Sequence, residues 1–233
     1  DIQVNTLKVS ADDYARALAR SDISHTLCDF PSGCITLHGG SVTALPGFEE
    51  GLFYVQDRAA RMAVEIAAPT PGMRVLDACS APGGKAFSAA VRMENRGSIL
   101  ACDIHEKKLA LIRQGAERLG IDIITTEARD ARRSDAALEG AFDVVIADVP
   151  CSGIGVIRKK PEIRCKSEDE IAGLPAIQRD ILANLSRFVK PGGTLLYSTC
   201  TVLECENEAV VKGFLESYND YALEPFTLGA ERA

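Results

Sequence analysis

Two cysteines in turn-rich segments are the residues of this sequence best placed for covalent chemistry. Cys151 lies in the segment DVPCSG, residues 148–153, and Cys200 lies in YSTCT, residues 197–201. Each segment follows an apolar run that reads as a strand, and a proline and a glycine fix the first turn. The thiolate form of cysteine is the nucleophile, and more of it is present when the environment lowers the pKa of the thiol. The two thiols, with Asp148 three residues before the first, therefore indicate catalysis, although these residues leave open which cysteine attacks.

A glycine-rich turn is the second feature with a chemical meaning. Residues 74–85 read as a short apolar strand, a Pro-Gly-Gly turn and a helix that starts near Lys85. Glycines let backbone approach a ligand, and the N–H groups of a helix start carry partial positive charge. Such a unit binds nucleotide-like cofactors at the carboxyl end of a parallel sheet. Because neither the dinucleotide fingerprint nor a P-loop is present, we expect a nucleoside cofactor without a large phosphate group.

Two further acids follow predicted strands. Asp103 ends the second strand, 19 residues after Gly84, where a carboxylate would accept hydrogen bonds from a ribose diol. Asp130 comes just after the third strand and could accept from the exocyclic amine of an adenine. Taken alone, Asp130 is a weak signal, because aspartate is common in loops.

A basic segment lies between the two cysteines. Residues 158–166 hold five basic residues against one acid, and Arg129, Arg132 and Arg133 add positive charge around Asp130. If both segments flank the cysteines, a polyanion could lie across this edge. The alternative is an ordinary solvated loop.

The predicted elements place these residues on one sheet. From residue 73 onward, strand and helix patterns alternate, which predicts a parallel sheet with helices on both faces. We expect strands at 98–103, 121–126, 142–148 and 194–198, and helices at 105–119, 177–188 and 204–218. Residues 1–68 are predicted to form a small α+β module, with a helix at 57–67, and residues 69–233 a Rossmann-like catalytic domain that lacks its last strands.

Composition narrows the function classes. The 233 residues are 46% hydrophobic, no apolar run approaches the ~20 residues that span a bilayer, and the first residues do not form a secretory signal. Eight cysteines without a C-x-x-C pair suggest neither zinc nor disulfides. The net charge of −7 argues against indiscriminate binding to nucleic acid. We expect a cytoplasmic monomer without a metal or a membrane partner.

The motifs resemble one family, the RNA (cytosine-5)-methyltransferases, in particular the bacterial Sun/Fmu (RsmB) type that acts on small-subunit ribosomal RNA. The segments that match, together with Asp103 and Asp130, are DACSAPGGK at 77–85, DVPCSG at 148–153 and STC at 198–200. NTLK at 5–8 and QD at 56–57 are similar to the family's N-terminal module. Val149 and Cys205 depart from the family's usual residues, and its N-terminal helical domain and final strand pair are missing, so we expect a fragment.

The resemblance implies a role for each site residue. It gives S-adenosylmethionine as the cofactor, Cys200 as the nucleophile, Cys151 as the residue that assists product release, and Asp148 as a contact to the target base. Asp103 would bind the ribose, and Asp130 would lie near the adenine. The implied cofactor-binding residues are Cys79, Ser80, Ala81, Pro82, Gly83, Gly84, Lys85, Asp103, Asp130 and Asp148. The implied RNA-binding residues are Lys85, Arg158, Lys159, Lys160 and Arg164.

Three other functions remain open from sequence. The same chemistry on transfer RNA fits the catalytic motifs equally well. A binding module that holds cofactor and RNA without turnover is disfavoured because it needs neither cysteine. A nicotinamide-dependent oxidoreductase is disfavoured because Pro82 lies within the loop and the dinucleotide fingerprint is absent.

Overall fold

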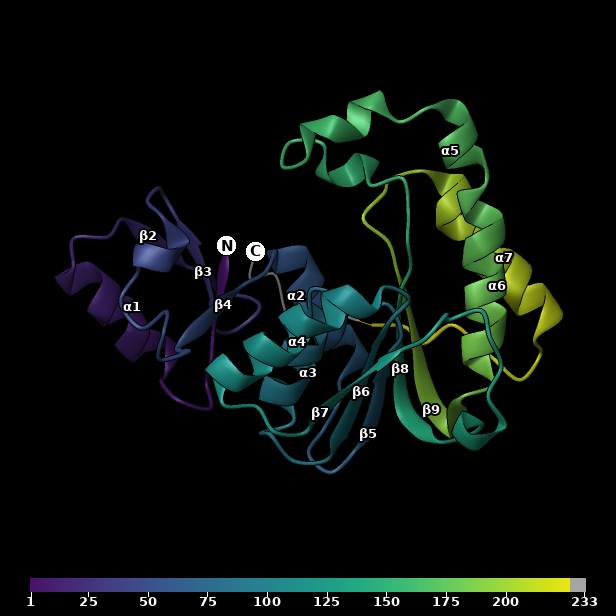
Figure 1. Cartoon of the computed structure of the whole chain (residues 1–233), viewed down its shortest axis with the longest axis horizontal. Coiled ribbons are helices and arrows are strands. Elements are labelled where there is room, and N and C mark those ends of the chain that lie inside the picture. The colour runs from purple at the N-terminus through teal and green to yellow at the C-terminus, as the bar shows by residue number, and fades with distance from the viewer. Residues whose placement is uncertain (227–233) are drawn as a thin grey trace.

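The structure is a computed structural model that describes residues 1–226, and it contains two sheets (Figure 1). The larger sheet is parallel, with strand order β7-β6-β5-β8-β9. Its strands are β5 (Arg74–Asp77), β6 (Ser98–Asp103), β7 (Ile124–Ala128), β8 (Phe142–Asp148) and β9 (Val189–Ser198). The helices that follow the first module are α2 (Arg58–Ala67), α3 (Gly84–Arg92), α4 (Glu106–Leu119), α5 (Glu168–Ala172), α6 (Leu174–Ser186) and α7 (Glu208–Ser217). The predicted fold class is confirmed.

Both faces of the parallel sheet are buried. Val75, Ile99 and Val144 face α2, α3 and α4, and the residues one position along the strands face the opposite side. There Leu76 and Val145 pack with α6, and α7 lies outside α6 (Figure 1). Burial on both faces explains why these strands read as continuous apolar runs rather than alternating ones.

The register of the strands brings the polar strand ends together. Asp77 ends β5, Asp103 ends β6 and Asp148 ends β8, and Asp148 pairs in register with Ser198 at the end of β9. All five strands run parallel, so these residues lie along one edge, the carboxyl edge of the sheet. The predicted clustering of chemistry at this edge follows from the topology.

Several predicted boundaries are wrong, each for a physical reason. β9 begins at Val189, not 194, and runs through Pro191-Gly192-Gly193, a sequence that is typical of a turn. β9 is an edge strand, where the missing N–H of proline costs no ladder bond. α6 starts at Leu174, three residues before the prediction, with Pro175 in its first turn. β7 begins at Ile124 instead of 121, and the last predicted helix divides into a 3₁₀ turn, Glu204–Glu206, and α7.

The N-terminal residues form a four-stranded antiparallel sheet with its own core. Its elements are β1 (Ile2–Val4), α1 (Ala11–Arg20), β2 (His25–Leu27), β3 (Cys34–Leu37) and β4 (Phe53–Val55), in the sheet order β2-β3-β1-β4. Sequence analysis missed β1 and β4, each only three residues long. The core contains Tyr14, Leu18 and Phe53. By contrast, α2 contributes Val64 and Ala67 to the core of the parallel-sheet domain, so the division at residue 68 stays a prediction.

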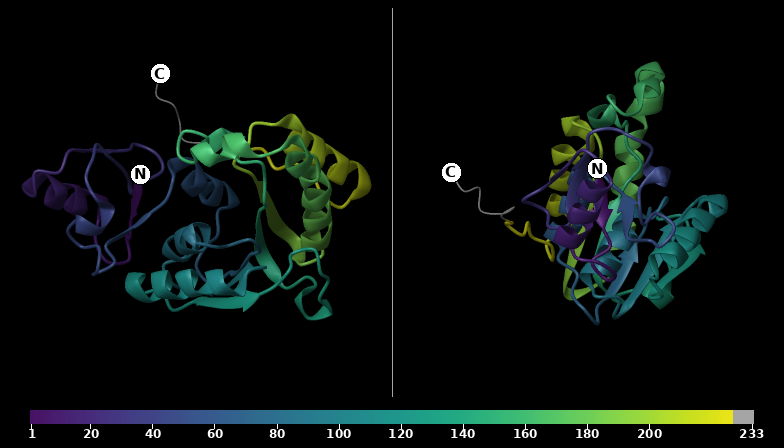
Figure 2. Two further views of the ribbon diagram at one scale, coloured as in Figure 1. Left: turned by 45° about the horizontal axis from the view of Figure 1, so that its top comes forward. Right: turned by 90° about the vertical axis from the view of Figure 1, so that its left-hand side faces the viewer.

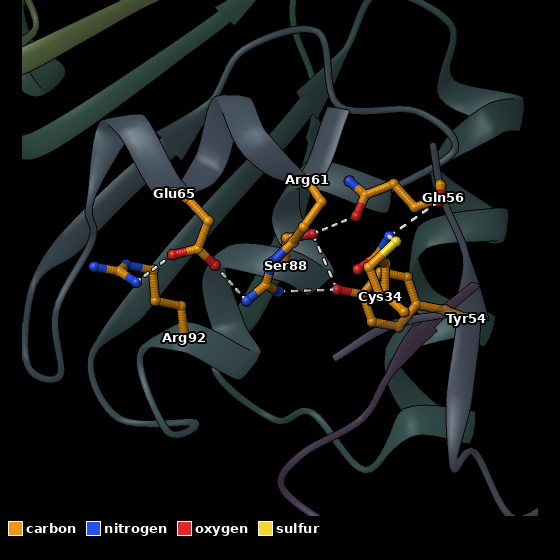
Figure 3. Close-up of polar contacts among 8 residues, drawn as sticks. Cys34, Tyr54, Gln56, Arg61, Glu65, Ser88 and Arg92 are labelled. Carbon is orange, nitrogen blue, oxygen red and sulfur yellow. Dashed lines mark hydrogen bonds and ion pairs between the residues drawn. The ribbon is translucent and has the colours of Figure 1, made fainter. Parts of the chain in front are cut away.

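A buried polar network joins the module to the catalytic domain (Figure 3). Ser88 on α3 donates a hydrogen bond to Gln56 Oε1 over 2.6 Å. Glu65 on α2 pairs with Arg61 at 2.6 Å and with Arg92 on α3 at 2.5 Å. Gln56, two residues before α2, is thereby tied to α3, the helix that follows the glycine-rich turn.

Within residues 1–226, no helix has both the length and the apolar character needed to cross a membrane. In the same part of the chain, no group of three or more His, Cys, Asp or Glu side chains is arranged to hold a metal ion.

Candidate active site

The two cysteines of the predicted catalytic pair lie side by side at the carboxyl edge. Cys151 follows β8 and Cys200 follows β9, and these strands are neighbours in the sheet. The two sulfur atoms are 3.1 Å apart, and the Cys200 backbone N–H donates to Cys151 Sγ over 3.2 Å. The Gly155 N–H donates to the Cys200 carbonyl over 3.0 Å. The two turns thus hold one thiol against the other.

The environments of the two thiols differ. The pKa of Cys200 is lowered to about 7, because its thiolate accepts a hydrogen bond from the Cys151 thiol. Burial and the charge of Asp148 oppose this lowering, and the positive charge of Lys160 assists it. The pKa of Cys151 is raised, first because its thiol is the hydrogen-bond donor to Cys200 and second because of burial. This asymmetry favours the thiolate at Cys200 over the thiolate at Cys151.

Asp148 is held on both carboxylate oxygens. Lys85 Nζ contacts one oxygen at 2.6 Å, and the Ser198 hydroxyl donates to the other over 2.8 Å. The Lys85 side chain is only 12% exposed. That burial favours a role for Lys85 beside Asp148 over a surface contact with an RNA phosphate.

The glycine-rich turn is shaped by packing inside the protein. Gly83 has φ +112°, and a Cβ there would approach the Phe87 ring to 2.6 Å. A Cβ on Gly84 would instead meet Gln56 Nε2 at 3.4 Å. The positive φ and the Phe87 ring therefore explain Gly83, whereas a Cβ at Gly84 would make only ordinary contact. That Gly84 leaves room for a ligand stays a prediction.

Buried polar groups without partners lie under this turn. Asp77 is fully buried, and within the described chain neither its two carboxylate oxygens nor the buried Ser80 hydroxyl has a hydrogen-bond partner. Burial raises the pKa of Asp77 to about 7, although the nearby Ser80 and Lys85 act in the opposite direction. Burying such groups is unfavourable unless a ligand satisfies them. The site thus fits a ligand that brings a cationic or hydrogen-bond-donating group to Asp77.

A pocket of about 430 Å³ lies beside Asp103, between the ends of β6 and β7. One Asp103 oxygen accepts from the His105 N–H over 2.9 Å, and no donor in residues 1–226 reaches the other. The ribose contact of Asp103 stays a prediction. The pocket is lined by Ile104, Glu127, Ala128, Arg129, Asp130, Arg133 and Ser134.

Asp130 lines this pocket but its carboxylate is occupied. Arg132 Nε and Nη2 donate to its two oxygens over 3.0 and 2.7 Å, and the Arg132 backbone N–H adds a third bond. These bonds hold the pKa of Asp130 down at about 2. Asp130 Oδ2 accepts only one of these bonds and can accept another. The adenine contact of Asp130 stays a prediction.

The basic segment runs over the same edge (Figure 2, left). It contains the 3₁₀ turn Pro161–Cys165 and follows another, Ile154–Val156. Lys159 pairs with Asp57 at the start of α2, so this positive charge is neutralised. Within the described residues, Arg158, Lys160 and Arg164 are exposed and have no ion-pair partner. Only part of the predicted RNA-binding set is thus free to contact a polyanion.

Sequence analysis assigned no individual role to three residues of the site. Ser198 bonds to Asp148 across the β8–β9 register. Asp77 was treated only as part of a motif, although its place at the end of a buried strand could have drawn attention to it. Glu206 accepts a hydrogen bond from the Ser152 N–H over 2.9 Å, and no motif spacing indicates this contact.

Comparisons with solved structures define the class. A methyltransferase homologue from Pyrococcus horikoshii superposes with a TM-score of 0.81 at 31% identity, covering 92% of this chain and 68% of that one. The NSun6 of Pyrococcus horikoshii, solved with the S-adenosylmethionine analogue SFG, shares the fold at 20% identity with a TM-score of 0.82, covering 93% and 79%. The fold is that of S-adenosylmethionine-dependent methyltransferases, and the orphaned Asp77 fits that cofactor's amino group.

The family follows from the sequence comparison. The profile of the 16S rRNA methyltransferase RsmB/F family matches residues 64–232, and the chain belongs to this family. The probable ribosomal RNA small subunit methyltransferase B of Bacillus subtilis (strain 168) is 36% identical over 222 residues, which are 94% of this chain and 50% of that protein. The chain spans about half the length of the curated relatives it matches. The suspected family and S-adenosylmethionine as its cofactor are confirmed.

Proposed function

We propose that this chain transfers a methyl group from S-adenosylmethionine to carbon 5 of a cytosine in RNA through a covalent adduct with Cys200. The observation that carries the proposal is the pair of thiols 3.1 Å apart, with the lowered pKa at Cys200. Small-subunit ribosomal RNA is the proposed substrate, because relatives such as that of Bacillus subtilis carry this substrate in their name. A cytoplasmic location and a monomeric state belong to the same proposal.

Covalent addition is needed because carbon 5 of cytosine is a poor nucleophile. The Cys200 thiolate adds to carbon 6 of the ring, and the electron pair of the 5,6 double bond moves toward carbon 5 and the ring nitrogen. Carbon 5 then bonds to the methyl carbon as the bond from that carbon to sulfur breaks. The cofactor supplies this methyl group on a sulfonium. Asp148, held by Lys85 and Ser198, has a lone pair left on each oxygen through which it would accept a hydrogen bond from the base and orient it.

Product release requires the adduct to collapse. A base removes the proton from carbon 5, the double bond re-forms, and Cys200 leaves as a thiolate. Cys151 is protonated and its sulfur is 3.1 Å from Cys200, so its thiol can hydrogen-bond the departing thiolate and stabilise it. The same hydrogen bond that prepares Cys200 for attack thereby assists its departure.

The binding residues have separate tasks. Asp77 and Ser80 would hold the methionine end of the cofactor, and Asp103 would bind its ribose. The target base must leave its stack to reach the thiols, which favours single-stranded or loop RNA. Arg158, Lys160 and Arg164 are exposed in the basic segment and would supply charge for the RNA backbone.

The test follows the covalent adduct in single variants. RNA and S-adenosylmethionine are mixed with the wild-type chain, Cys151→Ala or Cys200→Ala, and the products are run on denaturing gels. Cys151→Ala should accumulate an RNA–protein adduct that resists denaturation. Cys200→Ala should form no adduct and transfer no methyl group. The assay is run near pH 9 as well as pH 7, because Cys151→Ala also removes the bond that lowers the pKa of Cys200.

Two results would overturn the proposal. Methylation by Cys200→Ala would show that another group is the nucleophile. Binding of the cofactor by the wild-type chain, with no methylation or adduct on any RNA tested, would favour a binding module. Comparing ribosomal with transfer RNA in the same assay separates the two substrate classes.

A further inference from the structure

We propose that Glu206 is a positioning residue that fixes the turn bearing Cys151, so that this thiol stays against Cys200. The inference rests on the proposed function for the step that it affects. The contacts that support it belong to the turn itself and do not depend on which RNA is bound.

The Glu206 carboxylate holds the turn from the inside. Glu206 is 0% exposed, and its Oε2 atom accepts from the Ser152 N–H over 2.9 Å and from Gln178 Nε2 over 2.8 Å. Gln178 Nε2, on α6, also donates to the Pro150 carbonyl over 3.0 Å. The peptide groups before and after Cys151 are therefore both held by this one acid–amide pair.

The same acid lies just after Cys200 in the chain. Glu206 ends the 3₁₀ turn that follows the Cys200 segment, and its carbonyl accepts from the Tyr197 hydroxyl on β9 over 2.6 Å. A second link joins the two turns, because the Ser152 hydroxyl donates to Thr201 Oγ1 over 2.7 Å. Glu206 thus connects the two cysteine turns and α6.

An acidic side chain that only filled space would not be expected at this position. Burying a carboxylate is costly, and within the described residues Glu206 Oε1 and Gln178 Oε1 have no partner. An apolar side chain could fill the same space without that cost. What an apolar side chain cannot do is accept the N–H of Ser152, whose direction sets the path of the backbone at Cys151.

The variants separate positioning from folding. Glu206→Ala removes the acceptor. Glu206→Gln keeps one oxygen, which can accept both hydrogen bonds because Oε2 alone accepts both in the wild-type chain. Glu204→Ala is the matched control, since Glu204 lies exposed in the same 3₁₀ turn. If Glu206→Ala is insoluble, Gln178→Leu addresses the same acceptor from α6.

The first readout needs no RNA and no turnover. Cys151 and Cys200 are alkylated with iodoacetamide, and each site is followed by mass spectrometry. Glu206→Ala should raise the alkylation rate of Cys151 relative to that of Cys200 by roughly tenfold. This is the size expected when the hydrogen bond from the Ser152 N–H to the charged carboxylate is lost. Glu206→Gln and Glu204→Ala should keep the wild-type ratio.

The second readout is the adduct. Below its unfolding temperature, Glu206→Ala should bind the cofactor as wild type does but accumulate the RNA–protein adduct, as Cys151→Ala does. Glu206→Gln should restore turnover. Unchanged alkylation ratios in Glu206→Ala would overturn the inference, as would a uniform loss of cofactor binding, methylation and adduct. If the wild-type chain fails to methylate but the alkylation ratios change as described, the proposed function fails and the positioning role stands.

Discussion

At the scale of single residues, the candidate active site holds two cysteines in unequal environments. Cys151 and Cys200 are chemically identical, yet their hydrogen bond makes one a donor and the other a thiolate. Cysteine nucleophiles are commonly activated by a histidine or a helix N-terminus. In the proposed mechanism, Cys151 performs that task for Cys200. The reactivity of Cys200 should therefore depend on Cys151 even without RNA.

The pH dependence of alkylation tests this coupling. Because the pKa of Cys200 is lowered to about 7, its thiolate fraction and its iodoacetamide rate should rise as pH increases, with a midpoint near pH 7. Cys151→Ala removes the largest cause of the lowering, so the midpoint should move up toward the ordinary value of 9.0. The rate at neutral pH should then fall by about 50-fold if the midpoint reaches 9.0, because the thiolate fraction falls from about one half to about 1%.

The exposed Cys165 serves as the internal reference, and its rate should not change between the two proteins. An unchanged Cys200 midpoint in Cys151→Ala would show that Cys151 does not activate its neighbour.

The residues that sequence reasoning found are those whose signal is local. Cys151 and Cys200 follow strands in recognisable turns, and Asp103 lies at a fixed spacing from Gly84. Ser198, Gln178 and the side chain of Glu206 act through partners about 28 to 54 residues away. Such contacts depend on strand order and register, and no local pattern specifies them.

At the scale of elements, the glycine-rich turn shows how local rules and packing combine. The strand–turn–helix pattern is predicted correctly, because a buried apolar run, Pro-Gly-Gly and a helix start are local signals. The reason that a glycine stands at each of the two positions is not predicted by these local signals. The positive φ of Gly83 is a backbone requirement, and Phe87 occupies the space of its Cβ. Gly84 has no such φ and only ordinary contact with Gln56.

Alanine substitutions should separate the two glycines. Gly83→Ala should destabilise the chain by about 2–5 kcal/mol, from the positive φ together with overpacking against Phe87. Its affinity for S-adenosylmethionine should fall at least about tenfold, since about 1.4 kcal/mol of distortion suffices. Gly84→Ala should stay within about 1 kcal/mol of wild type, because alanine is the better helix former.

Urea unfolding and calorimetric titration of the cofactor provide the measurements. A loss of affinity in Gly84→Ala without a loss of stability would mean that the ligand approaches the backbone at this residue, as the sequence alone suggests.

At the scale of the whole molecule, the N-terminal module is fastened to the catalytic domain through the end of α4. Gly51 approaches Arg118 so closely that a Cβ would come within 1.9 Å of its carbonyl oxygen. Arg118 Nη1 in turn donates to the carbonyls of Phe48 and Phe53. The sequence indicates two units, but their docking could not be predicted, because it depends on backbone carbonyls that any sequence carries.

Asn5 is the buried centre of this interface, and its replacement provides the test of how the two units are coupled. Its Nδ2 atom donates to the carbonyls of Gly51 and Leu119 over 2.9 and 2.8 Å. Asn5→Ala leaves both acceptors without that donor, which should cost about 2–4 kcal/mol and lower the Tm by roughly 5–10 °C. Lys8→Met is the matched control, because Lys8 also reaches the Arg118 carbonyl but is exposed, so water can replace it with little effect.

In Asn5→Ala, hydrogen exchange should speed up in β1–β4 while the parallel sheet keeps its protection, since each unit has its own core. Equal loss of protection in both sheets would mean that the module and the catalytic domain unfold as one unit, and the predicted division of the chain would fail.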